Sequence, residues 1–172
     1  MELSTELQNL NAMVEAEQKN VDDDMQEYLA FSIGGEEYGV DILRVQEIKS
    51  WASVTPIPNT PNYLCGVLNL RGAIIPIVDL RLRFGMAKKQ VSPTTVVIFL
   101  KVEDQQTETV KTVGIVVDAV SDAYNINLGD IKPSPDFGEQ VNTTYILGLV
   151  AIADKMMMVL DIDLLLSAEA LA

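Results

Sequence analysis

The side chains that could carry out chemistry in this sequence are few, and their types exclude most catalytic designs. Histidine is absent and Cys65 is the sole cysteine, so Ser-His-Asp and Cys-His catalysis are excluded for this chain acting alone. One thiol without an imidazole is also a poor basis for a zinc site. Neither a P-loop nor a Gly-x-Gly-x-x-Gly motif is present to hold phosphates. The sequence therefore predicts neither a metal nor a cofactor.

Carboxylates are the remaining candidates for catalysis. Asp161 and Asp163 lie two positions apart, and Asp22, Asp23 and Asp24 form a run that could bind a metal. Each group also has a plainer explanation, because aspartate before a short helix is a typical N-cap and a charge run is usually solvated. A non-catalytic protein is favoured, and an enzyme based on these carboxylates stays as an alternative.

The stretch Gly66–Leu80 offers a different chemistry, that of recognition. Within it, Asn69-Leu70-Arg71-Gly72 places an amide and a guanidinium around a predicted hairpin turn. Turn chemistry explains Gly72, since glycine accepts a positive φ. It does not explain Asn69, because asparagine is disfavoured within a strand. Arginine is a frequent interface anchor, so either residue could contact a partner or serve only the turn.

The charge and hydropathy of the chain limit its partners. The formal net charge is −13, whereas nucleic-acid binding needs clustered positive charge and an anionic membrane surface attracts basic segments. No apolar run approaches the roughly 20 residues that cross a bilayer. The N-terminus also lacks the apolar region of a secretory signal. We therefore expect a cytoplasmic protein.

The sequence pattern predicts an all-β protein with short helices. Residues 1–27 carry leucines at helical spacing, but their acidic composition favours a flexible or weakly helical tail. From residue 28, short apolar runs alternate with turn signals, which predicts strands at 28–33, 36–40, 64–70, 73–78, 95–102, 110–118, 123–126, 145–153 and 156–160. Short helices are expected at 42–48, 79–84 and 161–171. Prolines within 54–61 predict an extended connector.

Two parts of the chain match each other in the same order. The matches are Gly39-Val40 with Gly114-Ile115, Pro56 with Pro133, Tyr63–Leu68 with Tyr145–Val150, and Ile77–Asp79 with Val159–Asp161. They predict an internal duplication of a unit of roughly 70 to 80 residues. Matched residues are explained by the fold, so Asp79 and Asp161 are expected to cap helices. Asn69 and Arg71 have no such match, so the fold does not explain them.

Several of these segments resemble one family. Glu36–Ile48, Gly66–Gly72 with Ile75–Leu80, and Thr112–Asp118 with Tyr145–Gly148 are similar to CheW, the coupling proteins of bacterial chemotaxis. The resemblance covers about residues 27 to 167 and omits the acidic tail. It implies two SH3-like five-stranded β-barrel subdomains packed around a shared core, the first at about 28–87 and the second at about 94–160. A C-terminal helix at about 161–171 would follow.

The same resemblance implies a function. Members of the family are adaptors without catalytic activity that link methyl-accepting chemotaxis receptors to the histidine kinase CheA in receptor arrays at the inner face of the membrane. The kinase's regulatory domain has the same double-barrel fold. Carried over residue by residue, the receptor-binding groove comprises Val45, Glu47, Ile48, Asn69 and Arg71. The surface that binds CheA comprises Val54, Thr55, Pro56, Tyr63 and Gly66.

Three alternatives stay open at this point. The chain could be a regulatory module of the kinase itself, since the fold would be the same. It could instead hold a small apolar ligand, because the run Met156–Met158 suits an adaptable pocket as well as it suits a core. Val45 and Ile48 could line a groove or belong to the core, since Val120 matches Val45 and Ala123 matches Ile48.

Overall fold

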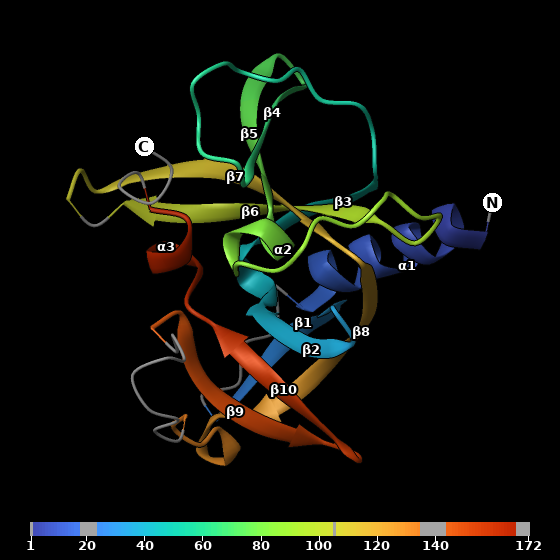
Figure 1. The fold of residues 1–172 in the computed structure, drawn as a ribbon. Helices are drawn as coiled ribbons and strands as arrows, with labels where there is room; N and C mark the ends of the chain where they lie inside the picture. The colour runs from blue at the N-terminus through green and yellow to red at the C-terminus, as the bar shows by residue number, and fades with distance from the viewer. Residues whose placement is uncertain (1, 18–23, 105, 135–143, 168–172) are drawn as a thin grey trace.

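Ten strands dominate the described part of the chain, and the prediction of an all-β protein with short helices is confirmed. The computed structural model describes residues 2–17, 24–104, 106–134 and 144–167 (Figure 1). The strands are β1 (Met25–Ile33), β2 (Glu36–Asp41), β3 (Val45–Ser50), β4 (Leu64–Leu70), β5 (Ala73–Asp79), β6 (Val96–Asp104), β7 (Thr109–Val117), β8 (Ala119–Asn127), β9 (Ile146–Ile152) and β10 (Lys155–Leu160). The helices are α1 (Glu2–Glu17), α2 (Leu80–Arg83) and α3 (Ile162–Leu165), with 3-10 turns η1 (Ile42–Arg44) and η2 (Leu128–Asp130).

The strands form two five-stranded sheets that exchange strands between the two halves of the chain. Sheet A has the order β8-β1-β2-β10-β9, and sheet B has the order β3-β6-β7-β5-β4. Each sheet therefore contains strands from the first half and from the second half. The predicted barrel bounds of 28–87 and 94–160 are wrong for this reason, because neither barrel is a continuous stretch of chain.

The internal duplication is confirmed by the strand orders. The equivalent strands are β3 and β8, β1 and β6, β2 and β7, β4 and β9, and β5 and β10. When each strand of sheet A is exchanged for its equivalent, the order of sheet A becomes that of sheet B. The equivalent parallel pairs join Gly39 to Val159 in sheet A and Gly114 to Ile77 in sheet B. Two copies of one unit have thus exchanged equivalent strands.

The contacts around the short helices repeat in the same way. The Asp79 N–H donates to the Tyr63 carbonyl at 2.7 Å, and the Asp161 N–H donates to the Tyr145 carbonyl at 2.8 Å. The carboxylate of each aspartate also accepts an N–H from the helix that follows. Both aspartates are N-caps of α2 and α3, as predicted.

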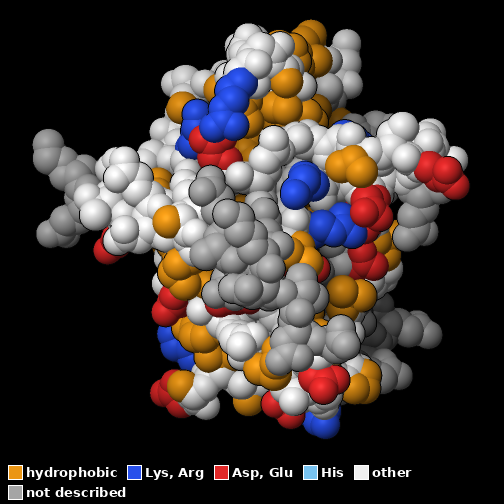
Figure 2. Space-filling view, turned by 180° about the vertical axis from the view of Figure 1, so that it is seen from behind, with side chains coloured by type: hydrophobic (Ala, Val, Ile, Leu, Met, Phe, Trp, Pro, Cys, Tyr) orange, Lys and Arg blue, Asp and Glu red, His pale blue; other side chains and the backbone are white. Residues whose placement is uncertain are grey.

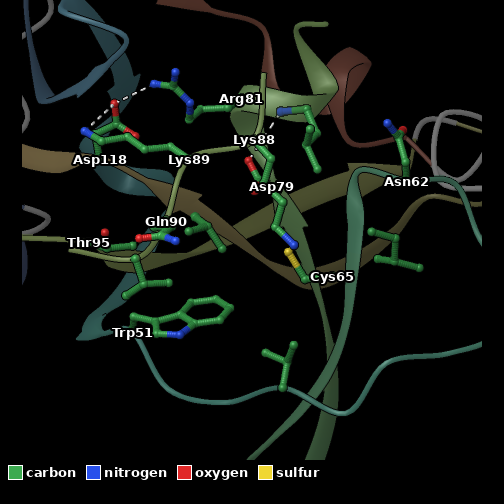
Figure 3. Close-up of a pocket in the computed structure, with 15 residues that line it drawn as sticks. Trp51, Asn62, Cys65, Asp79, Arg81, Lys88, Lys89, Gln90, Thr95 and Asp118 are labelled. Carbon is green, nitrogen blue, oxygen red and sulfur yellow. Dashed lines mark hydrogen bonds and ion pairs between the residues drawn. The ribbon is translucent and has the colours of Figure 1, made fainter. Parts of the chain in front are cut away.

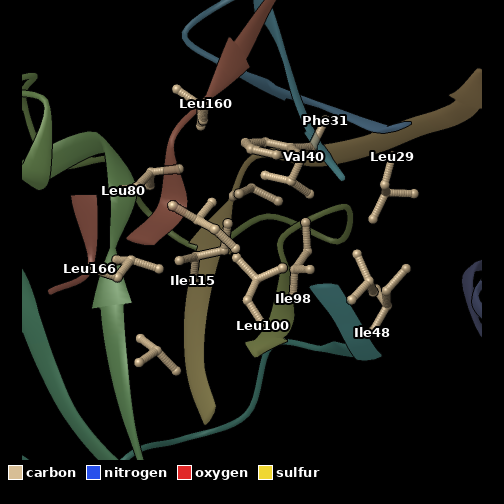
Figure 4. Close-up of a cluster of buried hydrophobic side chains, with 14 of the residues drawn as sticks. Leu29, Phe31, Val40, Ile48, Leu80, Ile98, Leu100, Ile115, Leu160 and Leu166 are labelled. Carbon is tan, nitrogen blue, oxygen red and sulfur yellow. The ribbon is translucent and has the colours of Figure 1, made fainter. Parts of the chain in front are cut away.

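The buried apolar side chains of the described residues form three clusters. One lies inside sheet A around Ala30 and Met157, and a second lies inside sheet B around Phe99 and Ile77. The third and largest is shared by the two sheets, and Figure 4 shows its central side chains converging from strands of both. The prediction of two five-stranded subdomains packed around a shared core is therefore confirmed.

One predicted helix is largely a strand. Residues 42–48 were expected to be helical, but only η1 is, where the Asp41 carboxylate accepts the Leu43 N–H at 2.9 Å. β3 then begins at Val45 and contains a bulge between Val45 and Glu47. The bulge places Val45 and Ile48 on the same buried side at a spacing of three. That spacing imitates one turn of a helix, which is why the sequence pattern is misleading here.

The ends of the described chain also differ from expectation. The acidic segment 1–27 was predicted to be a flexible or weakly helical tail, but α1 is a helix whose Leu7 and Val14 are buried in the shared core. β1 begins at Met25, within the same segment. α3 ends at Leu165, and residues 168–172 lie outside the described part of the chain. No helix within the described ranges is long and apolar enough to span a membrane.

Candidate functional site

An ion pair at one end of sheet B joins two of the predicted site residues. The Arg71 guanidinium in the β4–β5 turn lies 3.2 Å from the Glu47 carboxylate of β3. Glu47 also lies 3.8 Å from the Lys49 ammonium. The Glu47 side chain is only 15% exposed, whereas that of Arg71 is 72% exposed. A half-buried carboxylate thus anchors an arginine whose other donors face solvent, where a partner can accept them.

The β4–β5 turn explains the backbone of this site. Arg71 and Gly72 have φ values of 52° and 87°, the two left-handed residues that a tight hairpin turn requires. The Asn69 side-chain oxygen accepts the Gly72 N–H at 2.9 Å. The argument that turn chemistry does not explain Asn69 is therefore wrong, because its amide closes the turn. Ala153, the counterpart of Arg71, has a φ of 54°, so the turn demands the conformation but not an arginine.

Two of the five predicted receptor-binding residues lie in the core of this conformation. Val45 and Ile48 are 1% and 2% exposed and belong to the shared cluster. Asn69 and Arg71 are exposed, and Glu47 is half-buried. The structure thus brings Glu47 and Arg71 together at the surface, with Asn69 shaping the turn. The side chains of Val45 and Ile48 lie on the buried face of β3, and α1 packs on this strand.

The connector before β4 carries the residues assigned to kinase contact. Thr55 pairs with Val67 through two backbone hydrogen bonds of 2.9 Å, which leaves the side chains of Thr55 and Pro56 exposed. Val54 is half-buried against the cluster inside sheet B. The ring of Tyr63 lies 5.0 Å from the Arg83 guanidinium carbon, a cation–π contact that fixes its position.

Gly66 of β4 has a structural role beside this connector. A Cβ on Gly66 would overlap the Thr55 carbonyl, and a Cβ on its counterpart Gly148 would lie 2.6 Å from the Lys132 carbonyl. Gly66 is itself buried. It therefore allows the connector to approach β4 closely. Its effect on the exposed surface formed by Thr55 and Pro56 is indirect.

A surface cavity of about 370 Å³ bears on the alternative of a small ligand (Figure 3). Trp51 and Cys65 line its apolar part, and an ion pair of 2.9 Å between Arg81 and Asp118 lies at its edge. Burial, and secondarily Asp79, raise the pKa of the Cys65 thiol to about 11. Cys65 is therefore a neutral thiol at physiological pH and a weak nucleophile.

The methionine run has a packing role. Met157 is 1% exposed and lies in the cluster inside sheet A, where it fills the space beside Gly39. Met156 is exposed on the opposite side of the strand. Side chains of a strand alternate between its two faces, so packing explains Met157 and the run Met156–Met158 needs no ligand.

The carboxylates considered for catalysis have structural partners. Asp161 caps α3, and Asp163 accepts two hydrogen bonds from Arg44 at 2.8 and 2.7 Å and one from the Glu103 N–H at 2.9 Å. Burial raises the pKa of Asp163, but these hydrogen bonds outweigh burial and lower it below its usual range. Asp22 and Asp23 lie outside the described residues. Among the residues that are described, no group of three carboxylates or thiols is placed to hold a metal ion.

A comparison with known families shows which family this architecture belongs to. Residues 27–170 match the CheW-like domain family. The chain belongs to the CheW-like family. The acidic α1 lies outside the matched part of this CheW-like chain.

Individual relatives of the CheW-like chain agree with this result. It is 45% identical to the chemotaxis protein CheW of Klebsiella aerogenes, covering 86% of this chain and 85% of that one. It is 36% identical to the chemotaxis protein CheW of Rhizobium meliloti, covering 83% and 88%. The crystal structure of the scaffolding protein TtCheW from Thermoanaerobacter tengcongensis superposes with a TM-score of 0.72 at 32% identity, covering 84% and 94%.

Two residues beside Glu47 and Ile48, Lys49 and Asn11, were not predicted from the sequence. Lys49 lies beside Glu47 and is exposed. The helix expected at 42–48 concealed the strand β3, which carries both residues. Asn11 of α1 forms hydrogen bonds to Ile48. The helical spacing of the apolar residues in α1 was the available signal for a packed helix, and it was outweighed by the acidic composition.

Proposed function

We propose that this CheW-like chain is a non-catalytic adaptor that couples methyl-accepting chemotaxis receptors to the histidine kinase CheA. The observation that carries the proposal is the match to the CheW-like domain family over residues 27–170. Relatives named chemotaxis protein CheW and a related scaffolding protein support it. The proposed place of action is the cytoplasm, at receptor arrays on the inner face of the membrane.

Arg71 and Glu47 are proposed to contact the receptor, with Asn69 holding the turn. Support comes from the asymmetry of the duplication, because Asp122 and Ala153 occupy the equivalent positions of sheet A and the alanine cannot form an ion pair. The two equivalent turns have the same backbone conformation but different side chains, Arg71 and Ala153. The difference supports a role for the Arg71 side chain outside the fold. A planar guanidinium with free donors suits carboxylates and carbonyls on a partner.

The connector is proposed to contact the regulatory domain of CheA. Thr55 and Pro56 are exposed there, and Ile57 next to them is a large apolar side chain that is 41% exposed. Ile74 on β5 is 64% exposed. Figure 2 shows apolar side chains gathered at the upper end of the molecule, where β4 and β5 lie in Figure 1. Exposed apolar patches of this kind typically mark protein interfaces.

The decisive experiment is phosphorylation of CheA in receptor-containing membranes, with and without this protein. We expect strong receptor-dependent stimulation by the wild-type chain. Arg71→Asn should reduce receptor binding by about tenfold, equivalent to about 1.4 kcal/mol, because asparagine keeps the left-handed turn but removes the charge. Ala153→Asn, at the equivalent turn of sheet A, is the matched control and should bind normally. Absence of stimulation with cognate partners would refute the proposal.

The two contact surfaces can be separated by a second variant. Thr55→Arg adds a charged, bulky side chain on the connector, where only the backbone of Thr55 takes part in pairing with Val67. We expect it to weaken binding to the regulatory domain of CheA while leaving receptor binding unchanged. Equal loss of both interactions would contradict the assignment of the connector to the kinase.

A further inference from the structure

The acidic helix α1 covers the junction between the two sheets. It packs against η1, β3 and β8, and Figure 1 shows it running beside β3 with β8 close by. Leu7 and Val14 are 6% and 3% exposed, and Leu3 and Leu10 pack against the same shared cluster. These four residues form a single apolar stripe along the helix.

One polar side chain of α1 binds a strand edge. The Asn11 amide donates to the Ile48 carbonyl at 3.3 Å and accepts the Ile48 N–H at 3.1 Å. β3 is the edge strand of sheet B, so these backbone groups have no neighbouring strand of that sheet to bind. The Asn11 side chain thus forms hydrogen bonds with the Ile48 N–H and carbonyl, as a neighbouring strand would.

The surface beneath α1 overlaps the proposed receptor site. Val45 and Ile48 of β3, with Val120 and Ala123 of β8, belong to the same cluster as the buried residues of α1. Glu47 and Lys49 alternate with Ile48 along β3, and the ion pair to Arg71 is adjacent. We call these four apolar residues together with the Ile48 backbone the β3–β8 surface. Without α1, it would present apolar side chains and an open strand edge next to the charged pair.

The attachment of α1 is weak enough to be reversed. Among its described side chains, only Leu7 and Val14 are fully buried, and Leu3 and Leu10 are buried in part. A helix of 16 residues is itself marginal in water, so α1 loses helical structure when it leaves. α1 also lies outside the family match at residues 27–170, so the matched domain does not include the helix that covers it.

We propose that α1 is the chain's own occupant of the β3–β8 surface, and that an amphipathic receptor helix binds there only after α1 has left. This inference rests on the proposed coupling function. The occupant seen in the structure defines the chemistry of the partner. The partner would be a helix with apolar residues at the spacing of Leu3, Leu7, Leu10 and Val14, and with a polar side chain that reaches the Ile48 backbone. A bound receptor helix would replace both kinds of contact.

The first test opens the surface in the full-length protein. Leu7→Asp places a charge in the apolar contact and should release α1, whereas Met13→Asp adds the same charge at a position that is 37% exposed and is the matched control. A synthetic peptide of residues 1–17 should bind the Leu7→Asp protein and should bind the wild type and the control at least about tenfold more weakly, because a closed surface lowers apparent affinity in proportion to its open fraction. Equal peptide binding by all three proteins would overturn the inference.

The second test uses a milder change that keeps the apolar stripe. Asn11→Ala removes both hydrogen bonds to Ile48, and Asn9→Ala, at an exposed position of the same helix, is its control. Hydrogen exchange of the Ile48 amide should accelerate in Asn11→Ala and stay unchanged in Asn9→Ala. Unchanged exchange in both variants would show that Asn11 does not hold the edge and would overturn the inference.

The third test separates this inference from the coupling function itself. If the chain is an adaptor covered by α1, Leu7→Asp should bind receptor membranes more tightly than the wild type, and the peptide of residues 1–17 should compete. If the wild type binds receptors and Leu7→Asp binds them no better, the cover is refuted while the coupling function stands. If neither protein binds receptors but the peptide still discriminates between them, the coupling function fails and the covered surface remains. A dimer of the wild type that Leu7→Asp abolishes would instead assign α1 to a second copy and refute the intramolecular cover.

Discussion

Single residues in this protein show how a backbone requirement differs from a side-chain role. Arg71 and Ala153 have nearly the same φ, 52° and 54°, at equivalent turns of the two sheets. The turn therefore fixes the conformation, and the side chain is left for another purpose. Asn69 shows the reverse, because its amide is used by the Gly72 N–H within the turn. Of the two polar residues that attract attention in the sequence, the arginine is the better candidate for direct contact.

Gly66→Ala tests whether Gly66 is structural. An alanine Cβ would overlap the Thr55 carbonyl, so the connector must shift, and we expect the free energy of unfolding to fall by about 2–4 kcal/mol. Gly72→Ala is the control, because nothing lies near its Cβ position and only the positive φ costs energy, about 1 kcal/mol. Urea denaturation of both variants measures the difference. Equal losses would mean that the close approach to Thr55 contributes nothing.

At the scale of elements, one ion pair ties the two halves of the chain together. Arg44 of η1 forms a bidentate pair with Asp163 of α3, at 2.8 and 2.7 Å, and also donates to the Lys101 carbonyl on β6 at 3.0 Å. The two side chains are 25% and 17% exposed, so the pair is largely shielded from solvent. It fixes the position of α3 beside η1 and β6.

Asp163→Asn should expose this contribution through its pH dependence. The folded state lowers the pKa of Asp163, so its stabilising effect is complete above the unfolded pKa of about 3.9 and is lost as the pH falls through the lower folded pKa. We expect Asp163→Asn to cost about 1–3 kcal/mol at pH 7 and the difference from wild type to shrink near pH 3. Urea denaturation at both pH values measures it.

Asp161→Asn serves as the control for that experiment, since asparagine is also a good N-cap. It should change the free energy of unfolding by less than about 0.5 kcal/mol at pH 7. A constant difference between wild type and Asp163→Asn across the two pH values would contradict the charge-based account of the Arg44 pair.

The elements also show what the sequence alone could predict. The hairpin β4–β5 and strand β9 follow from alternating apolar residues around clear turn signals, and the capping aspartates follow from their place before short helices. β3 is missed because its bulge gives Val45 and Ile48 a helical spacing. α1 is missed because its acidic composition resembles a tail, and only contact with distant strands stabilises it. The ion pair between Glu47 and Arg71 depends on the closure of sheet B, which local patterns do not contain.

At the scale of the whole molecule, the exchange of strands makes the two sheets interdependent. Sequence matching reveals the duplication, but equivalent strands have equivalent edges and pair equally well within a copy or between copies. The alignment therefore cannot distinguish two separate barrels from two exchanged ones. Only the observed orders, β8-β1-β2-β10-β9 and β3-β6-β7-β5-β4, make the distinction.

Fragments of the chain test this interdependence. A fragment of residues 1–90 lacks three strands of sheet A and two of sheet B, so we expect it and the fragment 91–172 to be unfolded when separate. Mixed together, they should regain strand structure by exchanging the same strands, and the intact chain should unfold in one cooperative transition. Circular dichroism of the fragments, separate and mixed, checks this. A folded single fragment would show that one sheet can form from its own half.

The parallel pairing of β2 with β10 delays the completion of sheet A during synthesis on the ribosome. Glu37 is synthesised early, but its partner Met157 belongs to the last strand. At common rates of synthesis the interval is on the order of ten seconds. During that time the β1–β2 hairpin has emerged with its apolar face uncovered, and α1, which precedes it in the chain, has already left the exit tunnel. A helix that covers the β3–β8 surface in the finished protein is thus also available to cover the apolar face of the growing chain.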